Sequence, residues 1–313
     1  MAAAEYDAIV VGSGAGGGMA AYELTRRGLT VLMLEAGRNY DPATETPMMQ
    51  IPADAPLRDS PTPDKPFGFF DATVGGGWDV PGEPYTIAEG SEPFTWWRPR
   101  MLGGRTNHWA RVSLRFGPYD FKPYSRDGLG VDWPVTYDEI SPWYDAVERL
   151  IGVVGGPAQG LENTPDSPPG CLQPVPPPKA YERLVSRAFA SMGIPTAPVR
   201  AAILTQPIGD RKACIYATAC YRGCSIKANF QTPTVLLPPA LATGKLTVRT
   251  DAMVHTVELN AQGKASGVTF IDTKTGKRLR VRGKSVVLAA GACESARIML
   301  NSKSRHFRDG IGN

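Results

Sequence analysis

The sequence predicts an α/β fold, with a parallel strand–helix–strand unit at its start and an antiparallel meander near its end. The first observation comes from residues 6–37, where an apolar run, a glycine turn, a helical pattern and a second apolar run succeed one another within about 30 residues. The second is a series of alternating segments over 246–282, separated by turns. The third is a continuous apolar run at 285–292, which is typical of a buried parallel strand.

The opening unit has the glycine spacing of a nucleotide-binding turn. Residues 7–11 form the apolar strand, and Gly12, Gly14 and Gly17 follow it before a helical pattern begins at Met19. Gly12 would allow the tight turn, Gly14 would let a pyrophosphate approach the backbone, and Gly17 would let the helix pack closely on the strand. The helix N-terminus would offer free N–H groups and a positive dipole end to the phosphates.

An acidic residue completes this unit. The second strand covers residues 30–34 and ends in Glu35 and Ala36. At this spacing a carboxylate can accept hydrogen bonds from a ribose hydroxyl, which favours an unphosphorylated adenosine ribose. Glycine-rich loops also occur without a ligand, but the flanking strand, helix and acid together favour a dinucleotide site. A plain NAD-dependent Rossmann enzyme would share this unit.

Composition argues against several functions. The 313 residues are long enough for two domains, and 42% of them are hydrophobic, as in ordinary folded proteins. The net charge of +4 is spread without basic runs, so nothing indicates nucleic-acid binding. No stretch approaches the roughly 18 apolar residues of a transmembrane segment. The N-terminus has no secretory signal, so we expect a cytoplasmic protein, or a periplasmic one if a signal-bearing partner exports it.

Residues 38–100 are rich in proline and have little periodicity, which is typical of a long functional loop.

The pattern becomes helical after this loop. An amphipathic helix is expected from about Asp138, with its aromatic stripe in the core, and residues 155–178 mark a domain boundary. Further helices are predicted over 180–192 and 230–242.

The last third of the chain changes to strands. Four of them are expected in one antiparallel meander, at 246–249, 252–259, 266–272 and 278–282. A separate buried strand at 285–292 and a helix at 294–300 follow. These segments suggest three regions, 1–155, 156–245 and 246–313.

Taken together, the motifs resemble the flavin-dependent glucose–methanol–choline (GMC) oxidoreductases over essentially the whole chain. The resemblance rests on the first glycine turn with Glu35, the turn Gly103-Gly104-Arg105-Thr106-Asn107, Asp132-Trp133-Pro134, the meander and the run at 287–292. It implies FAD rather than NAD. It also implies a Rossmann-type FAD-binding domain formed by 1–155 and 246–313, and the start of an α+β substrate domain within 156–245.

The resemblance assigns roles to both glycine turns. The first turn would hold the FAD pyrophosphate, Glu35 the adenosine ribose, and the second turn would pass close to the flavin ring, while backbone at Val254 would meet the adenine. The candidate cofactor-binding residues are Gly12, Ser13, Gly14, Ala15, Gly17, Glu35, Ala36, Gly103, Gly104, Thr106, Asn107, His108, Val254, Ala290 and Gly291.

Two features of the family bear on catalysis. Its members generally run well beyond this length, and their later part supplies a His–His or His–Asn pair that removes the alcohol proton. We therefore expect this chain to be an N-terminal fragment whose catalytic base lies beyond Asn313, since none of His108, His255 and His306 occupies the place of that base. In some members a histidine at the position of His108 is bonded covalently to the flavin, and otherwise it only packs or hydrogen-bonds there. Arg105 would place a cation near the cofactor.

Three cysteines raise a second question about cofactors. Cys214, Cys220 and Cys224 lie close together among basic residues, and three thiolates could bind an iron–sulfur cluster, although four is the usual number. Their spacing is similar to that in the flavoprotein subunits of bacterial sugar and gluconate dehydrogenases. A zinc site without its fourth ligand, a disulfide with one remaining thiol, and buried thiols are the alternatives. We expect Cys171 and Cys293 to be structural.

The predicted function is therefore FAD-dependent oxidation of CH–OH groups in a small alcohol or sugar, with hydride transfer to flavin N5. We expect a dehydrogenase that passes electrons to a non-oxygen acceptor, with small and cytochrome subunits as candidate partners. The alternatives are an oxygen-using GMC oxidase, and a non-catalytic FAD-binding fragment or subunit that needs a partner.

Overall fold

The computed structural model describes residues 5–45, 83, 85–94, 96, 98–216, 220 and 223–313. The chain divides into two compact units. The first comprises Met1–Trp109, Ala217–Ser225 and Gln231–Asn313, and the second comprises Ala110–Tyr216 and Ile226–Phe230. Residues 110–155, which the sequence prediction assigns to the FAD-binding region, belong to the second unit. Most of the predicted functional loop at 38–100 lies outside the described residues. None of the described helices is long and apolar enough to cross a membrane.

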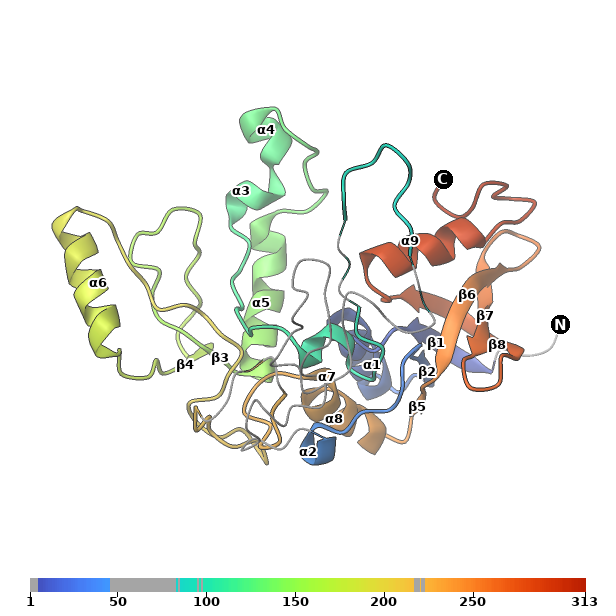
Figure 1. Ribbon diagram of the computed structural model, residues 1–313, viewed down its shortest axis with the longest axis horizontal. Coiled ribbons are helices and arrows are strands. Elements are labelled where there is room, and N and C mark those ends of the chain that lie inside the picture. Colours follow the sequence, from blue (N-terminus) through green and yellow to red (C-terminus); the bar gives the residue numbers. More distant parts are fainter. Residues whose placement is uncertain are drawn as a thin grey trace. The chain divides into compact units, whose positions relative to one another are not determined.

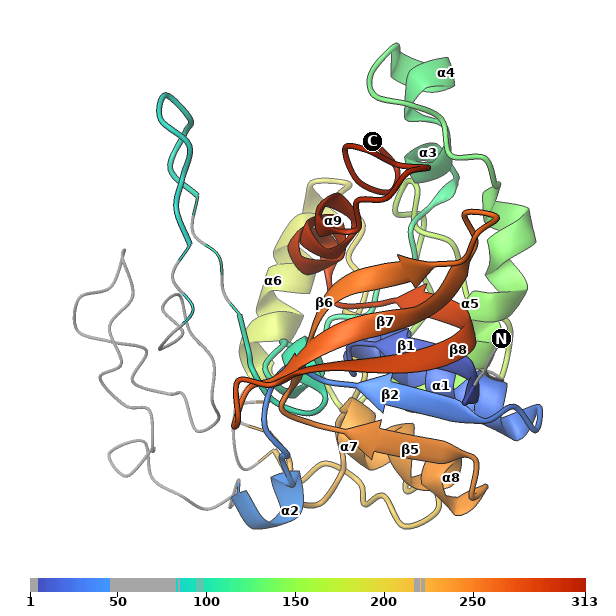
Figure 2. The same ribbon diagram turned by 90° about the vertical axis from the view of Figure 1, so that its right-hand side faces the viewer.

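The first unit is built on a mixed six-stranded sheet, which confirms the predicted α/β class (Figure 2). Its strand order is β5-β2-β1-β8-β7-β6. β1, β2, β5 and the second part of β8 run parallel, whereas β6, β7 and the first part of β8 form an antiparallel meander. The strands are β1 (Tyr6–Val11), β2 (Val31–Leu34), β5 (Leu246–Arg249), β6 (Ala252–Leu259), β7 (Ala265–Asp272) and β8 (Arg278–Leu288).

Two strand predictions were wrong. β5 was expected in the meander, but it pairs in parallel with β2 at the other end of the sheet. The two strands expected at 278–282 and 285–292 are one continuous strand, β8, which pairs first with β7 and then with β1. Gly283 lies at the change of partner, where a Cβ atom would come within 2.8 Å of Ile9. A glycine therefore lets the strand pass β1 closely without a break.

Helices cover both faces of the sheet (Figure 1). The first unit contains α1 (Ala15–Arg26), α2 (Pro42–Glu45), the 3₁₀ helix η2 (Gly104–Asn107), α7 (Thr232–Val235), α8 (Leu237–Ala242) and α9 (Ala292–Asn301). α1 begins at Ala15 rather than at the predicted Met19, because its first turn is almost all glycine and has no apolar periodicity to detect. The single helix predicted over 230–242 is two short helices, α7 and α8.

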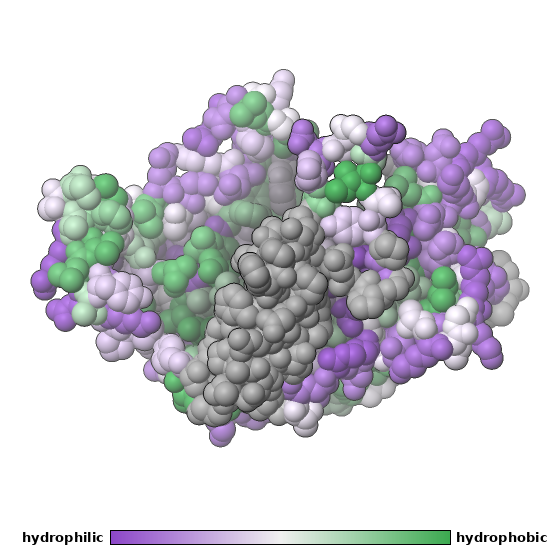
Figure 3. All heavy atoms as spheres, viewed as in Figure 1, coloured by the Kyte–Doolittle hydropathy of each residue, from purple (hydrophilic) through white to green (hydrophobic). Residues whose placement is uncertain are grey.

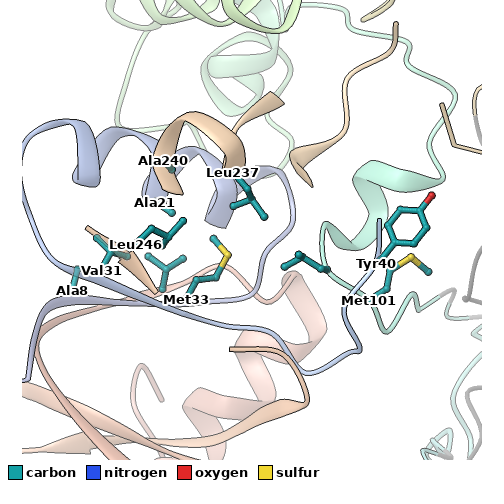
Figure 4. Packing of buried hydrophobic residues seen from close by; sticks show 11 residues of the cluster. Ala8, Ala21, Val31, Met33, Tyr40, Met101, Leu237, Ala240 and Leu246 are labelled. Carbon is teal, nitrogen blue, oxygen red and sulfur yellow. The ribbon is translucent and has the colours of Figure 1, made fainter. Parts of the chain in front are cut away.

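The alternation of side chains along β1 divides the core between the two faces. Ala8 and Val10 pack with α1 and α8 side chains such as Ala21 and Leu237 (Figure 4). Ile9 and Val11 face the opposite way and belong to a cluster formed with the meander and with Ile298 of α9. Both faces of β1 are therefore apolar, as the continuous run of residues in this strand requires.

Helices make up most of the regular structure that is described in the second unit. Its elements are α3 (Pro118–Phe121), α4 (Pro123–Asp127), α5 (Tyr137–Ile151), β3 (Val153–Val154), β4 (Leu172–Gln173) and α6 (Ala180–Ser191). Thr136 and Glu139 form a capping box that starts α5. The aromatic stripe of α5 was predicted to be a core face, but Trp143 is 63% exposed, and Tyr137 and Tyr144 are half-buried and stack on one another. The apolar side chains of α6 are also exposed, and the space-filling view shows them (Figure 3).

Candidate functional site

The first glycine turn has close backbone contacts at two of its glycines and open space at a third. Gly12 has a φ of +95°, and a Cβ atom there would lie 2.5 Å from the carbonyl oxygen of Ala289. A Cβ atom on Gly17 would lie 1.9 Å from the carbonyl oxygen of Gly12. Gly14 differs, because a Cβ atom there would meet nothing within 4 Å. The turn thus leaves open space beside Gly14 at the N-terminus of α1, which no side chain caps.

Glu35 lies beside this turn at the carboxyl end of β2. Its carboxylate is buried and accepts hydrogen bonds through both oxygens. Oε2 accepts from the backbone N–H of Ser13 at 3.1 Å and from the Ser13 hydroxyl at 2.5 Å, and Oε1 accepts from the backbone N–H of Gly37 at 2.8 Å. Burial raises the pKa of Glu35, and the hydrogen bonds from Ser13 and Gly37 oppose that rise.

The second glycine turn meets the first, although 90 residues separate them in sequence. The backbone N–H of Gly103 donates to the Ser13 hydroxyl at 2.8 Å. A Cβ atom on Gly104 would lie 3.6 Å from the Cα atom of Gly14. Gly103 has a φ of +91° and Gly104 a φ of +51°, so both favour glycine. The structure therefore brings Gly12–Gly14, Glu35 and Gly103–Gly104 together in one unit.

The polar cluster after the second turn has a structural role that the sequence did not reveal. The Thr106 hydroxyl donates to the Gly103 carbonyl at 2.6 Å and accepts from the backbone N–H of Thr232 at 3.0 Å. Asn107 is fully buried, and its amide donates to the Leu102 carbonyl at 2.9 Å. Both side chains hold the turn in place. His108 follows at the end of η2 and is half-buried, and Arg105 is exposed.

The start of β6 and the end of β8 lie beside the same region, and the backbone N–H of Ala252 donates to the Glu35 carbonyl at 2.8 Å. The backbone N–H of Ala289 donates to the Val11 carbonyl at 2.8 Å, so Ala290 and Gly291 leave the sheet beside the first turn. Gly291, with a φ of +87°, precedes α9. The Val254 carbonyl accepts from Arg297 at 3.1 Å. The predicted contact between Val254 backbone and adenine stays a prediction.

Arg100 was not singled out from the sequence, although it lies three residues before Gly103 of the second turn. Its Nε donates to Glu83 at 2.7 Å, and one Nη donates to Glu294 of α9 at 2.5 Å. Its charge also lowers the pKa of Glu35. The signal that could have found it is an arginine next to a glycine turn that is expected to approach a dinucleotide.

The remaining candidate residues are two histidines and the cysteines. His255 lies in β6, where burial and then the charges of Arg278 and Arg297 lower its pKa, and His306 is exposed. Cys214 belongs to the second unit, and Cys220 and Cys224 belong to the first. The iron–sulfur site stays a prediction. Cys171 is buried as expected of a structural thiol, whereas Cys293 is exposed at the start of α9.

Among the described residues, one group of three could offer metal ligands, and it lies in the second unit. Ligand atoms of Asp145, Glu148 and Cys171 are within 4.8 Å of one another. Arg115 already binds both carboxylates, Glu148 through two hydrogen bonds of 2.9 and 2.6 Å and Asp145 at 2.6 Å. The guanidinium thus supplies the positive charge of a buried ion-pair cluster.

Comparison with known proteins identifies the family. A family model described as GMC oxidoreductase matches residues 6–313. The chain belongs to the GMC oxidoreductases. It is 31% identical to 6'''-hydroxyparomomycin C oxidase from Streptomyces lividus, over 98% of this chain and 52% of that protein. It is 28% identical to the fructose dehydrogenase large subunit from Gluconobacter japonicus, over 98% of this chain and 56% of that protein.

The fold agrees with this membership of the GMC family. The crystal structure of pyridoxine 4-oxidase from Mesorbium loti superposes with a TM-score of 0.59 at 18% identity, covering 95% of this chain and 52% of that one. The chain spans about half the length of the GMC relatives it matches, 52% and 56% of the two named above.

Proposed function

We propose that this chain carries the FAD-binding part of a GMC oxidoreductase that oxidises CH–OH groups of alcohols or sugars. The observation that carries the proposal is the meeting of two glycine turns, Gly12–Gly14 and Gly103–Gly104, at the uncapped N-terminus of α1 beside a buried carboxylate. A single glycine turn would suit many nucleotides. Two turns in contact suit a long cofactor that extends past the first turn.

The residues fit FAD. The open space at Gly14 and the N–H groups that start α1 would receive the pyrophosphate. Glu35 would accept hydrogen bonds from the adenosine ribose, as a carboxylate at the end of the second strand does in this class of fold. When bound, FAD supplies a hydride acceptor at its N5 atom. The chain's own part is to bind and orient the cofactor, and η2 supports this by fixing the second turn through Thr106 and Asn107.

The acceptor of the electrons separates two versions of this proposal. The three-cysteine segment favours a dehydrogenase that passes electrons to a non-oxygen acceptor, because an iron–sulfur cluster would conduct them onward. One named relative is a dehydrogenase subunit and the other an oxidase. The alternative is an oxygen-using oxidase. A chain that binds FAD but turns over no alcohol would instead favour a non-catalytic subunit, acting with a partner in the cytoplasm or, if exported together, in the periplasm.

Steady-state assays of the native gene product test these versions. The protein is saturated with FAD and offered a panel of alcohols and sugars, first with an artificial dye acceptor under nitrogen and then with oxygen alone. Dye reduction without peroxide supports the dehydrogenase, and peroxide formation supports the oxidase. Retention of FAD without turnover of any substrate would support the non-catalytic subunit.

The cluster and the acceptor can be tested on the same preparation. Iron and labile sulfide are measured in the native protein and in a Cys220→Ser variant. The proposal expects iron in the native protein and loss of that iron in the Cys220→Ser variant. Absence of iron from anaerobically purified protein would contradict the cluster and remove the argument for the dehydrogenase.

A further inference from the structure

The Ser13 hydroxyl lies where three segments of the first unit meet. It is fully buried within the first glycine turn. It donates to Glu35 at the end of β2 at 2.5 Å, and it accepts from the backbone N–H of Gly103 in the second turn at 2.8 Å. A hydroxyl can donate one hydrogen bond and accept two, so this group serves both neighbours at once.

Each neighbour takes part in further hydrogen bonds. The Glu35 carboxylate also receives the backbone N–H groups of Ser13 and Gly37. The Gly103 carbonyl accepts from the Thr106 hydroxyl, which in turn accepts from the backbone N–H of Thr232. The Ser13 hydroxyl is the link between these two sets of hydrogen bonds.

We propose that Ser13 is a positioning residue, which locks the second glycine turn against the first and holds the Glu35 carboxylate in place for the ribose. This inference rests on the proposed binding of FAD. Alanine at position 13 would leave the buried N–H of Gly103 without this acceptor and remove one of the three donors to Glu35. Loss of a partner from a buried polar group is costly, so the arrangement of the two turns depends on this side chain.

The ionisation of Glu35 makes the proposal testable through the pH dependence of FAD affinity, which would not change if Ser13 only filled space. Burial raises the pKa of Glu35, and the Ser13 hydroxyl is the strongest influence that lowers it. Arg100 is the charged side chain that also acts on Glu35, and it is itself paired with Glu83 and Glu294. Removing the hydroxyl therefore raises the pKa of Glu35 further. Since the ionised carboxylate is the ribose acceptor, FAD affinity falls as pH drops through this pKa, and the fall begins at a higher pH in the variant.

The test is a titration of the apoprotein with FAD, followed by quenching of flavin fluorescence, from about pH 5 to pH 9. For Ser13→Ala we expect about 10-fold weaker binding at neutral pH and a midpoint shifted to higher pH. Ser13→Cys keeps a polar γ atom, which is larger than oxygen and donates only weakly, so it should show a shift in the same direction even if the alanine variant folds poorly. Thr25→Val is the matched control, because it removes a buried hydroxyl from the other end of α1, and its affinity and midpoint should be unchanged.

The outcomes separate this inference from the proposed function. If the unmodified chain binds FAD and the Ser13 variants bind it equally well, the inference is overturned and FAD binding stands. Uniformly weaker binding with an unchanged midpoint would also overturn it, because Ser13 would then act on packing alone. If the unmodified chain binds no FAD at any pH, the proposed function fails, and this inference fails with it.

Discussion

Replacing Gly14 by alanine should separate cofactor binding from folding. Gly14 has a φ of −65° and a ψ of −163°, which any residue can adopt. A Cβ atom there would touch nothing within 4 Å, so the folded protein has room for it. The same methyl group would occupy the open space that we assign to the FAD pyrophosphate.

The expected change in stability is close to zero. Alanine has less conformational freedom than glycine in the unfolded chain, which stabilises a compatible site by about 0.4–1 kcal/mol. Alanine is also a poorer N-cap than glycine, which costs about 0.5–1 kcal/mol at the start of α1. These contributions nearly cancel, so the melting temperature of the apoprotein should move by less than about 3 °C.

The expected change in binding is large. The methyl group would keep the phosphates from at least one backbone N–H, and a hydrogen bond to a charged group contributes about 1.5–3 kcal/mol. We therefore expect the dissociation constant for FAD to rise about 10- to 150-fold.

Thermal melts by circular dichroism and FAD titration measure both quantities on one preparation. Gly17→Ala is the contrasting variant, because its Cβ atom would lie 1.9 Å from the Gly12 carbonyl and should destabilise the fold itself. Wild-type FAD affinity in a folded Gly14→Ala protein would refute the placement of the pyrophosphate.

Three further predictions concern other parts of the chain. Arg115→Met should destabilise the second unit by about 3–5 kcal/mol in urea unfolding, because it removes the positive partner of the buried Glu148 and the half-buried Asp145. Arg27→Ala removes one partner of an exposed pair and should cost less than about 0.5 kcal/mol. A similar loss in both variants would contradict the buried cluster. Hydrogen bonds from Lys284 and Thr30 lower the pKa of Asp7. The ionised Asp7 carboxylate therefore stabilises the fold above the ordinary aspartate pKa of about 3.9, and this stabilisation is lost as the pH falls below that value. The difference in melting temperature between wild type and Asp7→Asn should therefore shrink on acidification, and a constant difference would disprove this linkage. If His108 carries the flavin, the denatured mass should include FAD and His108→Ala should lose that addition; a non-covalent flavin would leave both denatured masses without it.

Local sequence signals predicted the elements whose partners are close along the chain. β1, α1 and β2 form one continuous unit with a glycine turn and an acidic end, and β6 and β7 are joined by a short turn. Their patterns of two- and four-residue steps appear directly in the sequence. The helices α5 and α6 were likewise predicted within one or two residues of their observed bounds.

Features that depend on distant partners could not be predicted in this way. β5 has the alternation of a meander strand, but its partner is β2, which lies more than 200 residues earlier. The continuity of β8 depends on how closely Gly283 passes Ile9. The start of α1 was missed for a local reason, because its glycines carry no periodic signal. The pairings of β5 and β8 are set by the whole sheet rather than by the sequence of each strand alone.

The candidate site shows the same division. The glycines and Glu35 were found because their spacing is fixed within one unit. The hydrogen bond between Ser13 and Gly103, and the charge of Arg100 near Glu35, join segments that are far apart in sequence. The family resemblance placed the second glycine turn near the flavin, and its contact with the first turn is seen only in the structure.

Equilibrium titration of the apoprotein with FAD and, separately, with NAD⁺ is the measurement that tests the central claim most directly. Two glycine turns in contact beside Glu35 predict that the chain binds one FAD per molecule, turns yellow and shows no comparable affinity for NAD⁺. Tight binding of NAD⁺ without flavin, or binding of neither cofactor by correctly folded protein, would contradict it.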